Sequence, residues 1–461
     1  MPSTVLAVLQ LFDTATQKTT EIAMREPGVV GLYVCGPTVY GPPHVGHGRA
    51  VLIYDVLRRY LEFRGVFVQH VSNITDIDDK IINRARSERR DWHEVAIECE
   101  AEWLATMDRM GVLRPHQQPH ATDYVDKMIE LIASLVEREY AYETSEGVYL
   151  HAALVPDYGL LSHQSIEDRR VGARVEIDEA KDDPIDFALW KRAKPGEPAW
   201  HSPWGDGRPG WHTECVVMSL ELLGEGFELH GGGQDLIFPH HENERAQAVA
   251  DGHLFARHWI HNGLVTVAGE KMSKSLGNFT TLKDLLDRHD ARSYRFLVLQ
   301  AHYRSPLEVN ATTIDAAASG LARMDAFVRR VSGVDPSLDK IASAQSAQLR
   351  ERFIQAMDTD LDTPAALAEI FEAIRLANSL VDSNDAAAAR VIADTVAELL
   401  GALGLFIGQG ELADEEVNEM VARRDLARSR RDFATADEMR AQLEARGWTV
   451  EDTPEGTRIH R

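Results

Sequence analysis

Two histidines follow a Gly/Pro-rich turn, and their spacing suits a phosphate group. His44 and His47 lie at the point where an expected strand gives way to a helix, with Gly46 between them. Free backbone N–H groups and the helix dipole favour anions at such a place. Gly46 also leaves room for a flat base or a ribose to approach the backbone. Taken alone, two histidines at this spacing are more often a surface pair or a metal site.

Two lysines occur in a small polar loop much later in the chain. Lys271 and Lys274 belong to the stretch Gly-Glu-Lys-Met-Ser-Lys-Ser that ends at residue 275. Such a loop could close its ammonium groups over a polyphosphate and neutralise the charge that develops on a leaving pyrophosphate. A solvated lysine turn is the simpler interpretation of this pair alone, so the co-occurrence of the lysines with the histidines carries the weight.

The chain has only three cysteines, an odd number that argues against a disulfide framework. Cys35 and Cys215 therefore bind a metal or are simply buried. Cys99 lies in a helical pattern of apolar residues, and we expect it to be a core residue.

The elements that must position these residues predict an α/β fold. Residues 31–35 form a short buried strand, residues 47–64 a helix and residues 66–71 a second strand. A strand, helix, strand unit of this kind builds parallel sheets.

The rest of the first 310 residues contains further elements. Helical patterns fill about 92–140, and the Gly/Pro-rich stretch 194–211 is expected to be loop only. Residues 227–230 are a strand candidate, and the Gly-rich turn 231–235 leaves its carboxyl end.

Length and composition divide the chain into domains. At 461 residues, two to four domains are expected. Beyond about Asn310 the composition shifts to Ala, Leu, Arg and Glu, which indicates a helical domain. We therefore expect a domain over 1–310 with a helical and loop insertion over about 115–200, a helical bundle over 311–410 and a small unit over 415–461.

Charge and hydropathy bear on the partners. The net charge of 49 − 73 = −24 is a poor global match for a polyanion such as RNA. Residues 422–431, however, contain five arginines against one acid, so a basic footprint is expected near the C-terminus. No basic leader and no apolar run of about 18 residues occurs, from which we expect a cytoplasmic protein without a membrane partner.

The histidine and lysine pairs together resemble the two signatures of class I aminoacyl-tRNA synthetases. Within that class, several segments are similar to the cysteinyl-tRNA synthetases, and the likeness runs from the first strand to the tail at 451–457. Val45 replaces the more usual isoleucine, and Pro42-Pro43 makes the turn stiffer than expected. The segments that carry the likeness are Tyr-Val-Cys-Gly-Pro-Thr (33–38), Asn-Ile-Thr-Asp-Ile-Asp-Asp-Lys (73–80), Gly-Trp-His-Thr-Glu-Cys (210–215), His-Gly-Gly-Gly-Gln-Asp (230–235) and Phe-Pro-His-His-Glu-Asn-Glu (238–244).

The resemblance implies a fold and an activity. The fold is α/β, with a Rossmann-like parallel-sheet catalytic domain followed by an α-helical bundle and a small C-terminal anticodon-binding unit. The activity is ligation of L-cysteine to tRNA(Cys) by a monomer that uses Mg²⁺ with ATP. The cysteine carboxylate attacks the α-phosphate to give cysteinyl-adenylate, and the acyl group then passes to the tRNA. The implied catalytic residues are His44, His47, Lys271 and Lys274, and the implied ATP-binding residues are these four with Gly46 and Asp235.

The resemblance also implies one zinc ion held by Cys35, Cys215, His240 and Glu244. His240 and Glu244 lie four apart at the start of an expected helix and so project from one face. Two sulfurs, one imidazole and one carboxylate are an acceptable zinc set. His241 could replace His240, because the residues alone do not decide between neighbours.

A zinc ion would allow the enzyme to distinguish cysteine from serine. Cysteine and serine differ by one heavy atom, and pocket shape alone contributes only about 1–3 kcal/mol, or roughly 10–200-fold. A zinc ion binds a soft thiolate far better than a hydroxyl. We therefore expect the metal to select the amino acid by bonding to its sulfur.

The resemblance assigns the remaining contacts with less support from the residues themselves. Thr75 and Trp211 are implied as amino-acid pocket residues, although either residue type is often only structural at such a position. An Arg-rich amphipathic helix with Phe433 in its core would explain the C-terminal pattern without any RNA. The residues implied to contact the tRNA are Arg424, Arg428, Phe433, Asp437 and Asp452.

Two rival functions share much of this pattern. A paralogous ligase activates cysteine but passes it to an amino sugar in thiol biosynthesis, and it lacks the C-terminal extension. A noncatalytic RNA-binding or zinc-stabilised relative is the second rival. The intact histidine and lysine pairs argue against the latter.

Overall fold

A parallel sheet lies at the centre of the first 310 residues. The computed structural model describes residues 9–165, 181–266, 281–336, 340–408, 415–430, 432–446, 448–453 and 456–460. In this sheet, neighbouring strands follow the order β10-β9-β3-β4 and all run parallel. Its strands are β3 (Val29–Val34), β4 (Phe67–Val71), β9 (Leu229–Gly233) and β10 (His258–Asn262).

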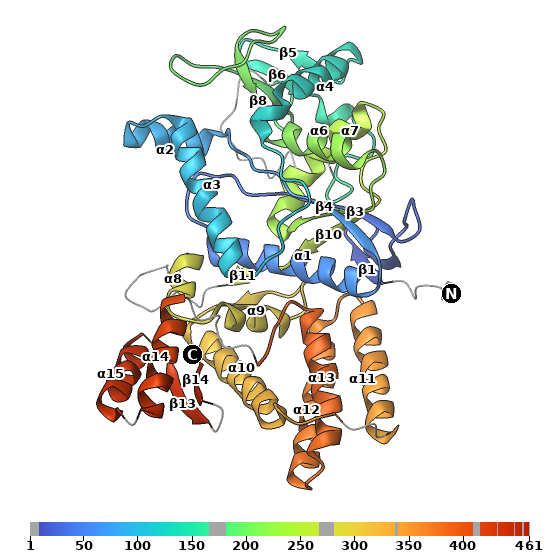
Figure 1. Ribbon diagram of the computed structural model, residues 1–461. Coiled ribbons are helices and arrows are strands. Elements are labelled where there is room, and N and C mark those ends of the chain that lie inside the picture. The colour runs from blue at the N-terminus through green and yellow to red at the C-terminus, as the bar shows by residue number, and fades with distance from the viewer. Residues whose placement is uncertain are drawn as a thin grey trace.

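Helix α1 (Val45–Phe63) connects β3 to β4, which confirms the predicted strand, helix, strand unit. Strand β3 is apolar along its whole length because helices cover both faces of the sheet. Figure 1 shows α1 on one side, with α6 (Trp211–Leu223) and α7 (Glu242–Ala250) on the other. At the carboxyl end of β3 a Cβ on Gly36 would lie 1.6 Å from the Asn73 carbonyl oxygen, so only glycine allows this close approach.

The insertion between β4 and β9 contains a second sheet, which we did not predict. Its four antiparallel strands follow the order β5-β6-β7-β8. They are β5 (Ala141–Glu143), β6 (Gly147–Leu150), β7 (Phe187–Arg192) and β8 (Gly207–Pro209). The expectation that 194–211 is loop only is therefore wrong. Pro209 is tolerated in β8 because it lies in an edge strand, where its only ladder partner is Trp190 of β7.

Two other boundaries differ from the sequence prediction. The helical patterns expected over 92–140 correspond to two helices with a break between them, because the chain leaves the first helix after Arg109 and Gly111 takes φ +66°. The strand expected at 227–230 is β9, which begins at Leu229 and continues through the glycines to Gly233. The helices of this region are α2 (Asp79–Glu88), α3 (Trp92–Arg109) and α4 (Val125–Glu137).

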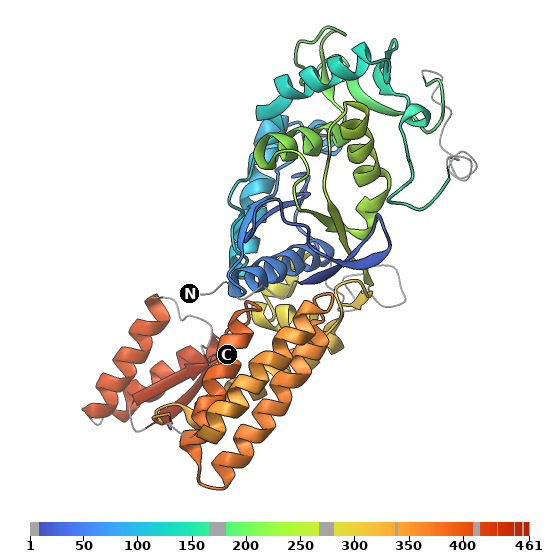
Figure 2. The same cartoon turned by 90° about the vertical axis from the view of Figure 1, so that its right-hand side faces the viewer.

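A helical bundle follows the first 310 residues, as the shift in composition near Asn310 predicts. Asn310 caps the first long helix in a reciprocal capping box with Thr313. The helices pack side by side below the sheet (Figures 1 and 2). They are α10 (Ala311–Val331), α11 (Lys340–Asp358), α12 (Thr363–Asp382) and α13 (Ala386–Gly401), and the preceding segments are β11 (Val265–Thr266), α8 (Leu282–Leu286), α9 (Ala291–Leu299) and β12 (Leu307–Glu308).

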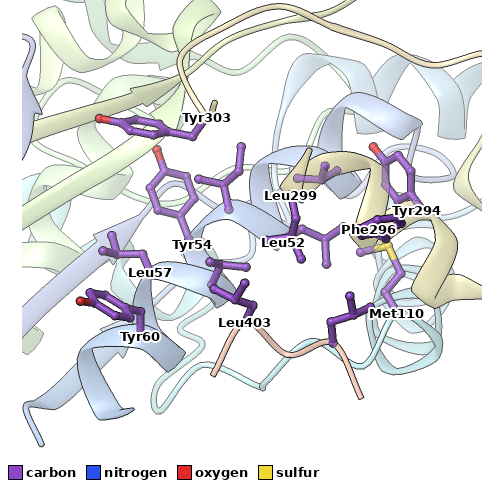
Figure 3. Packing of buried hydrophobic residues seen from close by; sticks show 14 of the residues in the cluster. Leu52, Tyr54, Leu57, Tyr60, Met110, Tyr294, Phe296, Leu299, Tyr303 and Leu403 are labelled. Carbon is purple, nitrogen blue, oxygen red and sulfur yellow. The ribbon is translucent and has the colours of Figure 1, made fainter. Parts of the chain in front are cut away.

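The sheet and the bundle share one hydrophobic core. Leu52 of α1 lies beside Leu299 and Phe296 of α9, and all three belong to one buried cluster with Leu403 from the end of the bundle (Figure 3). A buried ion pair reinforces the joint, since Arg295 Nη1 lies 2.6 Å from Asp55 Oδ2.

The C-terminal unit has its own small core. In Figure 2 it lies beside the bundle, near the end of the chain. Its elements are α14 (Glu415–Ser429), α15 (Phe433–Ala445), β13 (Thr449–Thr453) and β14 (Gly456–His460), and its buried core residues are Val417, Met420, Met439, Leu443, Trp448 and Val450. Within the described residues of the whole chain, no helix combines the length and apolarity needed to cross a bilayer.

Candidate active site and metal centre

A cavity of about 630 Å³ opens at the carboxyl ends of the parallel strands. Ligands bind at this edge in open α/β sheets because the loops that leave the strands diverge there. The end of β3, the start of α1, the end of β9 and the segment after β10 all contribute to the wall. Among the lining residues are Cys35, Gly36, His44, Gly46, His47, Trp211, Gly232, Asp235, Asn262, Gly263, Leu264 and Val265.

The two histidines form one stacked unit at the start of α1. Their ring centroids lie 3.5 Å apart with 17° between the planes. The backbone N–H of His47 donates to Nδ1 of His44, and the N–H of His44 donates to Nδ1 of His47, both at 3.3 Å. Since each Nδ1 accepts, each neutral ring carries its proton on Nε2 and can donate it to an anion.

Burial sets the protonation of this pair. It lowers the pKa of His44, and it lowers the pKa of His47 to about 3, with His44 and Lys80 adding to the effect on His47. Both rings are therefore neutral donors at pH 7. Gly46 leaves the cavity wall between the two rings without a side chain. A Cβ at this position would lie only 3.0 Å from the His44 ring.

The predicted metal ligands gather at the inner end of the cavity. Ligand atoms of Cys35, Cys215, His240 and Glu244 all lie within 4.8 Å of one another. Cys35 directly follows β3, Cys215 lies in α6, His240 lies in the kinked helical turn before α7, and Glu244 lies in the first turn of α7. Three of the four are almost fully buried, and Cys35 faces the cavity.

Distances within the cluster fit a tetrahedral ion. Two sulfurs bound to zinc at about 2.3 Å stand about 3.8 Å apart in a tetrahedron. The Cys35 and Cys215 sulfurs are 3.7 Å apart, and Cys215 Sγ lies 3.7 Å from His240 Nε2. Cys35 Sγ lies 3.4 Å from Glu244 Oε1. A disulfide has its sulfurs about 2.05 Å apart, so these cysteines are placed for a shared cation.

Charge inside the cluster is strongly coupled. Burial raises the pKa of the Cys35 thiol. Burial also opposes ionisation of Cys215, but its hydrogen bond with Cys35 and the nearby His240 outweigh this and bring its pKa to about 6. For His240 and Glu244, mutual attraction outweighs burial, so the pKa of His240 rises to about 10 and that of Glu244 falls well below its usual range. The charged forms of Cys215, His240 and Glu244 therefore stabilise one another, whereas Cys35 stays a neutral thiol.

Outer partners orient the ligands. His240 Nδ1 lies 2.9 Å from His212 Nδ1, which leaves His240 Nε2 directed at the cluster. Glu244 Oε2 lies 2.7 Å from His230 Nε2. Such contacts fix the tautomer of a ligating imidazole and the rotamer of a ligating carboxylate.

A second quartet overlaps the first. Cys35, His230, His241 and Glu244 also lie within 4.8 Å of one another. His241 Nε2 is 3.3 Å from Cys35 Sγ, while its Nδ1 is 2.8 Å from His261 Nε2. The geometry therefore brings both His240 and His241 to the cluster.

The other predicted pocket residues occupy different depths. Trp211 begins α6, lines the cavity and stacks on His240 with ring centroids 4.0 Å apart. Asp235 is exposed at the mouth of the cavity and raises the pKa of His44, against the larger effect of burial. Thr75 is buried, and its hydroxyl donates to Glu214 Oε2 at 2.6 Å. Thr75 thus shapes the wall from behind.

The predicted tRNA contacts are divided between surface and interior. Arg428, Phe433 and Asp437 are exposed, and 63% of Phe433 is accessible, so it is not the core residue of an amphipathic helix. Arg424 is only 2% exposed and donates to Thr457 Oγ1. Asp452 lies in β13, and its side chain, like the whole of Lys271 and Lys274, is outside the described residues.

Sequence reasoning missed the outer histidines and one acid. His212, His230 and Glu214 lie inside segments that carried the resemblance, and His261 lies in β10, but none was given a role. The available signal was the count of 19 histidines, several of them at strand ends or beside a predicted ligand. Cys99, expected in the core, is 2% exposed and accepts a hydrogen bond from Arg84.

Comparisons with known proteins agree with this architecture. The family described as tRNA synthetases class I (C) catalytic domain matches residues 21–319, and the DALR domain matches residues 352–407. The protein named Cysteine--tRNA ligase from Thioalkalivibrio sulfidiphilus is 45% identical over 98% of this chain and 100% of its own length. Proteins of the same name from Halorhodospira halophila and Caldicellulosiruptor saccharolyticus are 45% and 41% identical over 98% of the chain and 100% of their own lengths.

Solved structures show the same fold at low identity. Mycobacterium tuberculosis methionyl-tRNA synthetase in complex with methionyl-adenylate has a TM-score of 0.63 and 15% identity, covering 88% of this chain and 96% of that one. A putative arginyl tRNA synthetase from Campylobacter jejuni has a TM-score of 0.55 and 13% identity, covering 82% and 93%.

Proposed function

The chain belongs to the cysteine–tRNA ligases of class I, and from this premise we propose how its cavity activates L-cysteine and charges tRNA(Cys). The family match and the relatives of 41–45% identity make it a ligase. The observation that carries the proposal for the site is the buried set of four donor atoms that meets the cavity at Cys35.

We assign the metal ligands as Cys35, Cys215, His240 and Glu244. This quartet offers two sulfurs where the overlapping one offers a single sulfur, and soft ligands favour zinc. Zinc, when bound, prefers a thiolate to a hydroxyl and so separates cysteine from serine. His212 contacts the His240 ring and His230 contacts the Glu244 carboxylate. These contacts fix the orientation of both ligands, so the ligands need little rearrangement to bind the ion.

The amino acid lies between the metal ligands and the histidine pair. Trp211 stacks on His240 and presents its indole to the cavity, where it forms an apolar wall and a cation–π face for the substrate ammonium. The hydroxyl of Thr75 donates a hydrogen bond to Glu214. Thr75 therefore supports the cavity wall and does not bind the amino acid directly.

ATP, with Mg²⁺, occupies the opposite end of the cavity. The Nε2–H groups of His44 and His47 donate to phosphate oxygens, Gly46 lets the nucleotide approach α1, and Asp235 accepts from ribose hydroxyls or the substrate amine. The cysteine carboxylate oxygen forms a bond to the α-phosphorus as the bond to pyrophosphate breaks. Lys271 and Lys274 are assigned, from the family likeness, to neutralise the leaving pyrophosphate.

Transfer to tRNA completes the reaction. The terminal ribose hydroxyl attacks the carbonyl of the adenylate, and AMP leaves with the phosphate oxygen. The C-terminal unit presents Arg428, Phe433 and Asp437 on its surface, where they can meet unstacked bases. We propose that the enzyme works as a monomer in the cytoplasm, where tRNA charging serves protein synthesis.

The amino-sugar ligase is not favoured. The relatives named Cysteine--tRNA ligase align over 98% of the chain, which includes the C-terminal unit that such a paralogue lacks. A noncatalytic relative would need neither the neutral histidine pair nor an adjoining cavity.

The direct test is cysteine-dependent exchange of labelled pyrophosphate into ATP, followed by charging of tRNA(Cys) and of an amino sugar. We expect exchange and tRNA charging, with serine supporting neither. Exchange with amino-sugar transfer but no tRNA charging would establish the paralogue. Absence of exchange in a folded, zinc-loaded sample would establish a noncatalytic relative.

A further inference from the structure

Arg49 is a fully buried cation on α1, two residues after His47. Its side chain is 1% exposed. Nη1 donates to the carbonyl oxygens of Gly263 and Leu264, each at 2.9 Å. Nη2 donates to the carbonyl oxygens of Tyr303 at 3.2 Å and His302 at 3.5 Å, and also to that of Ser305. One guanidinium thus gathers five main-chain carbonyls from two segments.

No carboxylate balances this charge within the described part of the chain. All the hydrogen bonds of the Arg49 guanidinium there go to carbonyl dipoles. Burial lowers the pKa of Arg49 to about 10, which still leaves the group charged at neutral pH. A methionine would fill similar space without the desolvation of an ion, so burial alone gives no reason for arginine.

The bonded segments form one side of the cavity. Gly263 and Leu264 line it directly, and Leu264 accepts a backbone hydrogen bond from Leu307. The backbone N–H of Gly263 donates to the Tyr303 carbonyl oxygen. Arg49 itself is not among the residues that line the cavity, whereas His44, Val45, Gly46, His47, Ala50 and Val51 around it are.

Space at this junction is tight. A Cβ on Gly263 would lie 2.5 Å from the carbonyl oxygens of Arg304 and Ser305. The segment after β10 therefore packs directly on the segment before β12, and the planar fork of Arg49 reaches both at once. A lysine ammonium is a compact donor that cannot span five carbonyls in this arrangement.

We propose that Arg49 is a positioning residue for adenylate formation: it sets the spacing between the histidine pair on α1 and the cavity wall at 263–264. The proposal rests on the proposed function, because it assumes that ATP binds between these walls. Misplacement of reacting groups by about 1 Å can cost roughly 100-fold in rate. Arg49 should therefore affect the ATP step and leave the metal centre alone.

The test compares Arg49→Met and Arg49→Lys with Arg64→Met in the full-length, zinc-loaded enzyme. Arg64 is a matched control at the other end of α1, where its guanidinium pairs with Asp358 at 2.5 Å. Zinc content, thermal unfolding, and kcat and KM for ATP and cysteine are measured in pyrophosphate exchange. We expect Arg49→Met to lower kcat/KM for ATP about 100-fold, with zinc content and the cysteine KM unchanged and with partial recovery in Arg49→Lys.

Several results would overturn the proposal. They are wild-type kcat and KM for ATP in Arg49→Met, or an equal loss in Arg64→Met at a matched loss of thermal stability. If Arg49→Met does not fold, wild-type kinetics in Arg49→Lys would overturn it instead. Absence of exchange in the unsubstituted enzyme would refute the proposed function, which is a separate outcome.

Discussion

The predicted metal ligands and the predicted tRNA contacts were both assigned by family likeness, but the two sets of residues differ in burial and in how close together they lie. All four metal candidates meet at one point, and three of them are at most 2% exposed. Of the five tRNA candidates, one is buried, three are exposed, and one has a side chain outside the described residues. Residues that bind one ion in the interior must lie close together, so their positions in the fold bear on the assignment. Residues that act on a surface partner need only be accessible.

The largest expected effect is the loss of the metal centre in Cys215→Ser. A hydroxyl is a poor ligand for zinc, and only one sulfur would remain in the set. We expect zinc content to fall below stoichiometric and kcat/KM for cysteine to fall by at least about 1000-fold, more than the roughly 10–100-fold typical of outer-shell changes. Mass spectrometry of the native protein and pyrophosphate exchange measure the two effects.

Cys99→Ser is the matched control for this change. Cys99 is equally buried but lies in α3, where it accepts a hydrogen bond from Arg84. It should keep full zinc content and normal exchange. Unchanged zinc in Cys215→Ser would remove Cys215 from the ligand set and favour the overlapping quartet of Cys35, His230, His241 and Glu244.

A smaller effect is expected from His212→Phe, which keeps the ring volume but removes the partner of His240 Nδ1. Zinc affinity should fall by about 10–100-fold, measured by competition with a chelator. The companion variant His261→Phe removes the partner of His241 Nδ1. A larger loss in His261→Phe than in His212→Phe would move the ligand role to His241.

The parallel sheet and the turn with His44 and His47 could be predicted from local patterns in the sequence. The unit from β3 through α1 to β4 was predictable because apolar periodicity switches from strand to helix and back over one short stretch, with Gly65 at the helix stop. Asn310 marked the bundle because a capping residue coincides with a shift in composition.

Other features depend on contacts between distant segments. Strand β8 has the sequence Gly-Arg-Pro and forms by pairing with β7, so no local pattern predicts it. The outer histidines His212 and His261 are assigned by their neighbours in space. The hydrogen bonds of Arg49 depend on backbone carbonyls in 263–264 and 302–305, which no side-chain motif records.

On the C-terminal unit, Phe433→Ala tests whether exposure marks a contact. The ring is 63% accessible at the start of α15 and is not among the core residues of the unit, so its removal should leave thermal unfolding unchanged. If it stacks on a base, kcat/KM for tRNA charging should fall about 10-fold, since one base stack is worth about 1–3 kcal/mol. Pyrophosphate exchange is the internal control, because activation without tRNA should be normal. Full charging efficiency would remove Phe433 from the interface.

The smallest effect on charging is expected from Arg424→Met, although this residue belongs to the same predicted set. Its guanidinium joins α14 to β14 through Thr457, which in turn donates to Asp425 at 2.5 Å. A group so enclosed supports the unit's shape, so its loss should lower the stability of the C-terminal unit by about 1–2 kcal/mol. Limited proteolysis and thermal unfolding should detect this loss. At 25 °C, where the folded state still predominates after a loss of about 1–2 kcal/mol, charging should change by less than about threefold, because the enclosed guanidinium makes no contact with RNA. A large loss of charging at unchanged stability would show instead that the guanidinium turns outward to meet RNA, and burial would then cease to separate structural residues from contacts in this region.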